Sequence, residues 1–279
     1  MGAMAQTALW MAAARAGESR RPDRLFDDPY AAAVAAGSGI SPTATQESGS
    51  ALIAIRTRFF DDYLLRATEV FGACQVMILV VGLDARAYRL PWPHGTTVYE
   101  LDRPELLAVK DAILAREGAV PSCERKPLGV DLAADWTSTQ IDAGYRHEEA
   151  SAWLAEGLLF YLEEPAVQAL LGRVADLAAY CSRLAVDTVN AGYLTSKWTT
   201  NVPPRFAQHG CSWRFGTDEP ERLLAERGWR AWVTQAGEQG ASNGRWPAAP
   251  SRVPQAPRWF FVTAERAWPV RANNRLALH

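Results

Sequence analysis

The chain has 279 residues, 48% of them hydrophobic, so it can bury the core of one large α/β domain, and we expect a single domain over 1–279. Its 29 basic and 31 acidic residues leave a formal net charge of -2 without a block of Lys and Arg, which argues against nucleic acid as a partner. No apolar run approaches the roughly 18 residues of a membrane span, so we expect a soluble, cytoplasmic protein. The four cysteines lie far apart, which favours neither disulfides nor a metal site.

Two helical stretches open the chain. Helical apolar spacing runs from Thr7 to about Ala36, and a second helix is predicted from about Ala51 to Ala67. Between them, residues 37–50 form a loop rich in Gly, Ser and Thr. Together these parts give a predicted N-terminal helical segment over residues 5–70.

Strand-like runs then alternate with helical ones such as 104–116 and 165–180. The predicted strands are 76–81, 97–101, 126–130, 151–155, 183–188, 229–234 and 259–263. Strands separated by helical crossovers indicate an α/β fold with a doubly wound, mainly parallel sheet. The last two strands are joined by the Gly- and Pro-rich stretch 237–257, which allows an antiparallel final strand at the sheet edge.

One region, residues 190–220, departs from this alternation because a strand there does not pass quickly into a helix. Ligands of doubly wound folds bind outside the carboxyl ends of the strands, where long loops often form lids, so we predict a substrate cap. The predicted substrate residues are Tyr193, Lys197, Trp198, Arg205, Phe206, Trp213 and Arg214. The alternative is an aromatic insert that packs onto the surface for stability alone.

The first predicted strand ends in a turn that contains Val80, Gly82 and Asp84. A glycine in such a turn lets the backbone approach a ligand closely, which Gly82 can do and Val80 cannot. Glu100 and Asp102 stand two apart at the end of the second strand, and a carboxylate there can accept hydrogen bonds from both ribose hydroxyls. These features alone fit NAD as well as S-adenosylmethionine (SAM).

Carboxylates also follow the third and fourth predicted strands. Asp131, next to Leu132, can accept a hydrogen bond from an adenine amino group, and Glu156 can face the cationic end of SAM. Helix capping is the alternative role for Asp131 and for Asp84.

The second predicted helix carries Arg58 in a charged cluster. Its guanidinium can hold the carboxylate of an amino-acid-like cofactor through a bidentate pair. The alternative, which the bare sequence favours, is an ion pair with Asp61 or Asp62 on a solvated helix face.

Several stretches share a further pattern: Ala8–Trp10, Phe26–Ala31, Arg56–Asp62, Gly82–Leu90, Asp131–Leu132 and Trp153–Leu158. Together they resemble the leucine carboxyl methyltransferase-like group of SAM-dependent O-methyltransferases, which includes actinobacterial and polyketide-tailoring members. The resemblance implies a Rossmann-like, mainly parallel seven-stranded sheet with SAM across the strand ends. By this resemblance, Arg58 corresponds to the ligand of the SAM carboxylate, and Gly82 and Asp84 lie in the glycine loop. Asp102 corresponds to the ribose ligand, and Asp131 and Leu132 to the residues flanking adenine. Glu156 corresponds to the acidic residue near the methionine portion. The chain departs from the family pattern at Val80, where a glycine is usual.

Methyl transfer requires an enzyme to hold the nucleophile in line with the methyl carbon and close to it. A carboxylate is ionised at pH 7, whereas a phenol usually needs a base, so we expect a carboxylate or acidic hydroxyl on a small secondary metabolite such as a polyketide. His209 and Tyr161 are the candidate catalytic residues, and no Cys/His cluster accompanies Cys211 to hold a metal.

Other interpretations remain open at this stage. One alternative is a protein with the methyltransferase fold that has lost methyl transfer and catalyses another reaction, such as a cyclisation. The missing glycine at Val80 keeps this alternative open. A non-catalytic binding protein is a third hypothesis. The sequence is compatible with a monomer or a homodimer.

Overall fold

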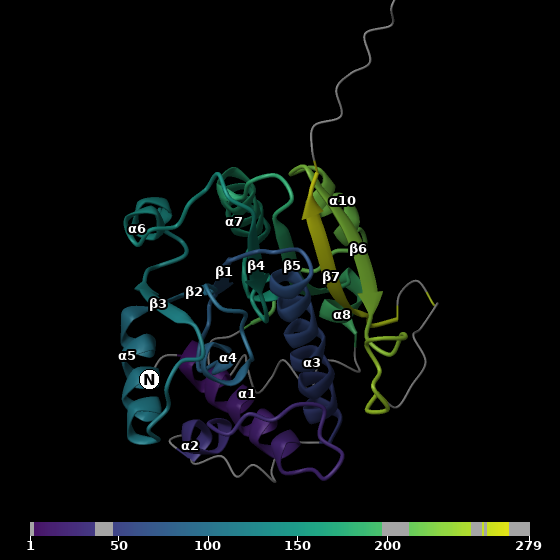
Figure 1. The fold of residues 1–279 in the computed structure, drawn as a ribbon. Helices are drawn as coiled ribbons and strands as arrows, with labels where there is room; N and C mark the ends of the chain where they lie inside the picture. Colours follow the sequence, from purple (N-terminus) through teal and green to yellow (C-terminus); the bar gives the residue numbers. More distant parts are fainter. Residues whose placement is uncertain (1–2, 37–46, 197–211, 247–252, 254–255, 268–279) are drawn as a thin grey trace, which may run out of the picture.

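The computed structural model describes residues 3–36, 47–196, 212–246, 253 and 256–267, and within them the chain forms a seven-stranded sheet flanked by helices (Figure 1). The strands are β1 (Gln75–Leu79), β2 (Thr97–Asp102), β3 (Glu124–Gly129), β4 (Ser151–Ala155), β5 (Arg183–Val189), β6 (Trp229–Gln235) and β7 (Trp259–Arg266). The helices are α1 (Ala3–Ser19), α2 (Ala31–Ala36), α3 (Glu47–Glu69), α4 (Arg86–Arg89), α5 (Pro104–Arg116), α6 (Thr137–Asp142), the 3-10 helix η1 (Leu159–Tyr161), α7 (Glu164–Leu177), α8 (Ala191–Thr195) and α10 (Pro220–Ala225). The predicted α/β fold class is confirmed.

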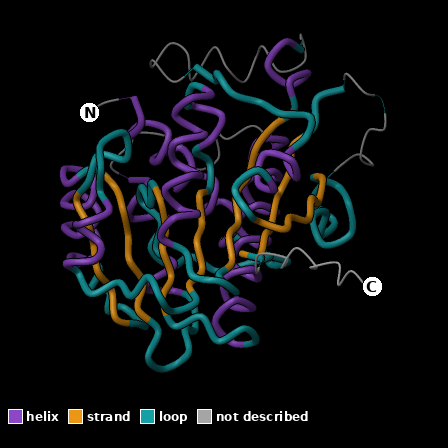
Figure 2. The backbone as a smooth tube through the Cα atoms, turned by 90° about the horizontal axis from the view of Figure 1, so that it is seen from above, coloured by secondary structure: helices purple, strands orange, loops and turns teal. Residues whose placement is uncertain are grey.

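The strand order is β3-β2-β1-β4-β5-β7-β6, and Figure 2 shows the strands side by side in one twisted row. The strands β1 to β5 are parallel to one another, while β7 runs antiparallel to both β5 and β6. The expected antiparallel direction of the last strand is confirmed, but its expected edge position is wrong, since β6 forms the edge. The burial of the two strands agrees with this order: β7 buries four consecutive residues, 259–262, as an interior strand does, whereas β6 exposes Arg230 and Trp232.

The core lies on both faces of the sheet because successive strand residues point to opposite sides. In β1, Met77 and Leu79 pack with α7 and α10, while Val76 and Ile78 pack with α3 and α5. The sheet is therefore the middle layer of three, and its rim at the carboxyl ends of the parallel strands stays accessible to the loops that follow them.

The N-terminal segment lies near that rim, below the strands in Figure 1. The predicted helical stretch 7–36 is two helices, α1 and α2, because Pro22 and Pro29 fall in the turn between them and proline interrupts a helix interior. α3 begins at Glu47, four residues before the predicted start. None of the described helices is both long and apolar enough to cross a membrane.

Candidate active site

The predicted carboxylates gather at the carboxyl ends of the parallel strands. Asp102 is the last residue of β2, Asp131 lies two residues after β3, and Glu156 directly follows β4. Asp84 lies in the turn between β1 and α4, and β1 is the neighbour of both β2 and β4. Parallel strands end on the same side, so one rim of the sheet collects these side chains.

Asp102 fastens the turn after β1 to the end of β2. Its Oδ2 accepts a hydrogen bond of 2.7 Å from the Gly82 N–H, and its Oδ1 accepts one of 2.7 Å from the Arg103 N–H. The Val81 N–H adds a bond of 3.1 Å to the Leu101 carbonyl. Burial raises the pKa of Asp102, and the two N–H donors act against that rise. The carboxylate thus borders the turn that the sequence singles out.

Val80, at the start of this turn, adopts a backbone conformation that β-branched residues rarely take. Its φ is +51°, and that of Gly82 is +55°. A left-handed conformation costs a non-glycine residue about 1–3 kcal/mol. The partly buried side chain of Val80 packs on the same apolar cluster as Leu132. Position 80 therefore suits glycine for two reasons. Glycine adds no side chain to the turn, and it adopts a left-handed backbone conformation without strain.

A buried cluster of ion pairs adjoins the turn, with Arg86 at its centre. Arg86 Nη1 lies 2.6 Å from Glu156 Oε2 and also bonds Asp84, while Arg86 Nε lies 2.6 Å from Asp61 Oδ1. Arg89 holds both carboxylate oxygens of Asp61 at 2.7 and 2.8 Å. Burial by itself raises the pKa of Asp84, but the charges of Arg86 and further arginines outweigh burial and lower it to about 2. Asp84 is therefore ionised at neutral pH.

The two arginines of the α3 motif have different surroundings. Arg58 is exposed and donates a bond of 2.8 Å to Asp62 Oδ2, which is the solvated pairing that the bare sequence favours. Arg56 is buried, with Nε 2.8 Å from Glu156 Oε1 and Nη1 3.2 Å from Asp187 Oδ2. The structure thus brings Arg56 to the strand ends and leaves Arg58, the predicted carboxylate ligand, on the outer face of the helix.

Asp187, on β5, belongs to this site but was not among the predicted residues. It is fully buried; its Oδ1 accepts a bond of 2.6 Å from the Gly157 N–H, and its Oδ2 accepts one of 3.1 Å from Trp259 Nε1. Burial raises its pKa, and the charge of Arg56 acts against that rise. The available signal is a carboxylate directly after the apolar residues 184–186 of a predicted interior strand, because a buried carboxylate requires a partner.

Asp131 and Leu132 lie at the more open side of the rim. Asp131 is exposed, and its Oδ1 accepts a bond of 3.0 Å from the Ala133 N–H. α6 begins only at Thr137, so Asp131 caps no helix. Leu132 is partly buried, and its carbonyl lies 3.4 Å from Arg173 Nη1. The adenine contacts of both residues stay predictions.

An aromatic cluster forms where the predicted cap leaves and rejoins the fold. The ring of Trp213 lies 4.7 Å from Phe160, 5.2 Å from Tyr193 and 5.5 Å from Trp259, measured between centroids. Tyr161 stands edge-on to Trp213 at 6.3 Å. Burial raises the pKa of Tyr193 to about 12. The structure therefore joins two predicted substrate residues, Tyr193 and Trp213, with the candidate catalytic Tyr161.

Of the remaining substrate predictions, the structure describes Arg214, which does not join this cluster. Arg214 is exposed, and its Nη1 lies 3.0 Å from Glu163 Oε1, so its charge has a surface partner. Lys197, Trp198, Arg205, Phe206 and the candidate base His209 lie outside the described residues.

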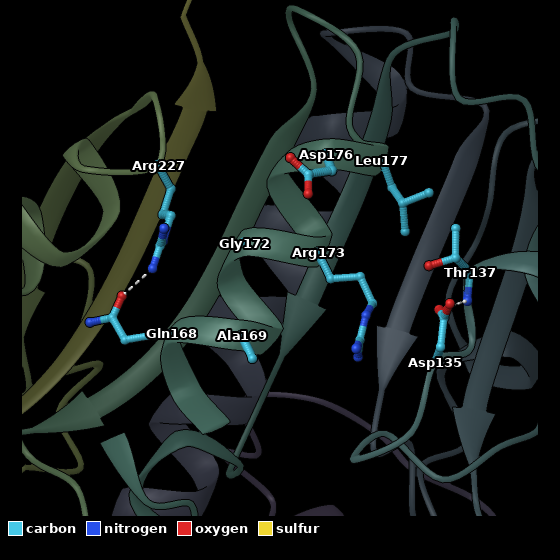
Figure 3. A pocket seen from close by; sticks show the side chains of 9 residues that line it. All are labelled: Asp135, Thr137, Gln168, Ala169, Gly172, Arg173, Asp176, Leu177 and Arg227. Carbon is cyan, nitrogen blue, oxygen red and sulfur yellow. Dashed lines mark hydrogen bonds between the residues drawn. The ribbon is translucent and has the colours of Figure 1, made fainter. Parts of the chain in front are cut away.

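A separate groove lies beside α7 (Figure 3). Arg173 and Asp176 of α7 line it, together with Asp135 and Thr137 at the start of α6. None of the predicted cofactor or substrate residues lines this groove, and its charges are of both signs. We assign it no part in the site.

Comparisons with known proteins identify the family of the chain. Residues 8–175 match the leucine carboxyl methyltransferase family. A protein of Parafrankia sp. (strain EAN1pec), named for SAM-dependent methyl transfer, is 42% identical over 275 residues that cover 94% of this chain and 87% of that protein. A relative from Saccharopolyspora erythraea with a name of the same kind is 38% identical, over 93% of this chain and 94% of the relative.

The chain therefore belongs to the leucine carboxyl methyltransferase family. The predicted family is confirmed, and with it the prediction that SAM is the cofactor. Among solved structures, a DUF574-family protein from Streptomyces avermitilis has a TM-score of 0.61, covering 92% of this chain and 97% of that one at 14% identity. That likeness shows the shared fold.

Proposed function

We propose that this chain transfers the methyl group of SAM to a carboxylate or acidic hydroxyl of a small molecule such as a secondary metabolite. The observation that carries the proposal is the cluster of buried Arg56 and Arg86 with partly buried Glu156 beside the Gly82 turn. The proposed setting is the cytoplasm, with a monomeric or homodimeric enzyme.

The residues along the rim fit an extended nucleoside that carries an amino-acid chain. Asp131 follows β3 and Glu156 follows β4, with β2 and β1 between them. A ligand that reaches from one to the other crosses three strand spacings, about 14 Å. Asp102, at the end of β2, lies between these two positions and suits a ribose. The order of side chains along the rim therefore matches the order of groups in SAM.

We propose that Arg56 holds the cofactor carboxylate in place of Arg58. Arg56 already has its charge in the buried interior, where a charge-assisted hydrogen bond is stronger than at an exposed helix face. Glu156, fixed in orientation by Arg56 and Arg86, keeps acceptor capacity for an ammonium group. SAM supplies a methyl group on a sulfonium, which an oxygen nucleophile displaces in line.

The aromatic cluster favours an acceptor that is already ionised. With a pKa of about 12, Tyr193 stays protonated at neutral pH, so it can donate a hydrogen bond but cannot take a proton from the substrate. A carboxylate needs no base, because it is ionised at pH 7. Rings such as Trp213 and Phe160 offer an apolar wall for the body of such a substrate.

The test is a transfer assay with SAM that is radiolabelled on the methyl group, run against a panel of aromatic carboxylic acids and phenols. The proposal expects label in an organic-extractable product. Mild base separates the two acceptors, because it hydrolyses a methyl ester to volatile methanol and leaves a methyl ether intact. A protein that binds SAM and labels no member of a broad panel would count against methyl transfer.

A second candidate function rests on the left-handed conformation of Val80. A turn that combines strain with a bulky side chain suits a scaffold that has abandoned methyl transfer for another reaction, such as a cyclisation. This candidate expects SAM to bind weakly or to remain unconsumed while the substrate changes. Product mass distinguishes the two, since methylation adds the mass of one CH2 and a cyclisation by isomerisation adds none.

A further inference from the structure

One face of α1 rests on the turn that follows β1. A Cβ placed on Gly82 would lie 3.5 Å from the Ala8 Cβ, so the helix packs closely against the turn. Leu83 is buried in an apolar cluster with Leu9 and other α1 residues. Arg15, two turns further along the same side of α1, donates a bond of 2.8 Å from Nη2 to the Leu83 carbonyl. The helix thus holds the turn by packing and by one charged donor.

Arg15 is itself fixed in place. Its Nε lies 3.0 Å from Asp28 Oδ2, and only 11% of its side chain is exposed. Asp28 is buried, its N–H donates a bond of 2.8 Å to Ser19 Oγ, and Ser19 Oγ donates one of 3.0 Å to the Arg15 carbonyl. One side of the guanidinium is therefore anchored to α1 and its following turn, and another donor faces the Leu83 carbonyl.

The left-handed conformation of the turn requires stabilising contacts, because it is unfavourable for Val80. A β-branched residue at a φ of +51° is strained, and the strain is relieved if the turn shifts. On the β2 side, the N–H groups of Val81 and Gly82 bond Leu101 and Asp102. Away from β2, Arg86 bonds Asp84 near the end of the turn, and Arg15 of α1 bonds the Leu83 carbonyl between Gly82 and Asp84.

We propose that Arg15 is a positioning residue that keeps the cofactor turn in its left-handed conformation against the preference of Val80. Its effect on cofactor affinity rests on the proposed function, whereas its effect on the turn does not. The role differs from plain structural support, because it predicts that the need for Arg15 depends on the residue at position 80.

A double-mutant cycle of Arg15→Met with Val80→Gly tests this dependence, with the dissociation constant of S-adenosylhomocysteine (SAH) from calorimetry as the readout. In the parent background, loss of Arg15 lets the turn relax, and binding must restore the strained form; we expect affinity to fall about tenfold. In the Val80→Gly background, the left-handed form has no penalty, and we expect a fall of less than about threefold. Equal losses in both backgrounds overturn the proposal.

Hydrogen exchange of the cofactor-free protein provides a second readout that needs no ligand. Arg15→Met should speed exchange at the Val81 and Gly82 amides, and Arg15→Lys, which keeps the charge, should restore part of the protection. The matched control is Arg21→Met, since Arg21 is an exposed arginine just beyond α1 that pairs with Asp23, and it should leave these amides unchanged. Unchanged protection in Arg15→Met overturns the proposal.

The two readouts separate the proposals. If the parent protein does not bind SAH but exchange depends on Arg15, the proposed function fails and the positioning role stands. If SAH binds and neither readout depends on Arg15, the positioning role fails alone. If Arg15→Met does not fold, Arg15→Lys replaces it in the cycle. The loss of SAH affinity should again be larger in the parent background than in the Val80→Gly background, but the two losses should differ by less.

Discussion

Replacing Arg56 with Met removes the guanidinium that neutralises Asp187 and keeps a long side chain in its place. Asp187 is fully buried, so the substitution leaves a carboxylate in the interior without its ionic partner. Breaking a buried ion pair from one side destabilises by about 3–5 kcal/mol. Asp187 retains the bonds from Gly157 at 2.6 Å and from Trp259 at 3.1 Å, which places the expected loss at the low end, about 3 kcal/mol.

For a domain of this size, such a loss lowers Tm by about 5 °C. The deficit also depends on pH. Without Arg56 the pKa of Asp187, already raised by burial, rises further. A carboxyl whose folded pKa exceeds its unfolded value favours the folded state at low pH and loses that contribution as pH rises through the folded pKa. The difference between parent and variant should therefore shrink as pH falls from 8 to 5.

Thermal unfolding across that pH range measures the stability effect, and calorimetry with SAH measures the functional one. We expect Arg56→Met to weaken SAH binding about 10- to 100-fold, the value of a hydrogen bond to a charged group. Arg58→Met is the matched control: it removes an exposed pair with Asp62, worth about 0.3–0.5 kcal/mol, and an exposed bond to the Leu25 carbonyl, so Tm should fall less than in Arg56→Met and affinity should hardly change. If Arg58→Met impairs binding and Arg56→Met does not, the reasoning is refuted.

Three further substitutions test other parts of the account. Asp84→Asn should remove about 2 kcal/mol of stability above pH 4, because the pKa of Asp84 falls from 3.8 to about 2 on folding. This contribution of the ionised carboxylate disappears as pH drops from 4 to 2, so the stabilities of parent and variant should converge there. Parallel acid-unfolding curves for parent and variant would contradict this. Val80→Gly should raise SAM affinity about three- to tenfold in calorimetry, and unchanged affinity would mean that the side chain does not obstruct the cofactor. Lys110→Met should destabilise by about 1.5–3 kcal/mol in urea, the value of a hydrogen bond between charged groups, because fully buried Glu100 loses its 2.8 Å bond to Lys110 and keeps its 2.7 Å bond to Arg125; unchanged stability would show that Arg125 alone compensates the charge of Glu100.

The fold was predictable because its signals are local. Runs of apolar residues bounded by turns mark most of the strands, and the seven predicted strands coincide with β1 to β7 apart from a few end residues. The position of β7 between β5 and β6 depends on contacts between residues that are distant in sequence. It follows only from the structure, in which residues 259–262 of β7 are continuously buried and Arg230 and Trp232 of β6 are exposed.

Which of Arg56 and Arg58 faces the interior depends on the side of α3 on which each residue lies. Leu52, Arg56 and Phe60 follow one another at four-residue intervals and are all buried, so Arg56 lies on the apolar stripe. Arg58 lies two residues away and hence on nearly the opposite side. The sequence holds this signal, although the charge of Arg56 obscures it, because an arginine on an apolar stripe makes sense only once its partners Glu156 and Asp187 are known.

The backbone of the cofactor turn was beyond the reach of sequence patterns. The missing family glycine marks Val80 as unusual, but a φ of +51° follows from the way β1, β2 and α1 hold the turn together. Arg86 likewise joins Asp61 and Glu156, which lie 25 and 70 residues away in sequence. Such contacts arise from packing, not from spacing.

Calorimetric titration of the full chain with SAM tests the central claim most directly, because the proposed chemistry requires the cofactor to occupy the rim between Asp131 and Glu156. The account predicts saturable binding of SAM and of SAH, weakened about 10- to 100-fold in Arg56→Met and retained in Arg58→Met. Absence of binding heat at millimolar SAM, with a folded protein and with Val80→Gly equally silent, would contradict it.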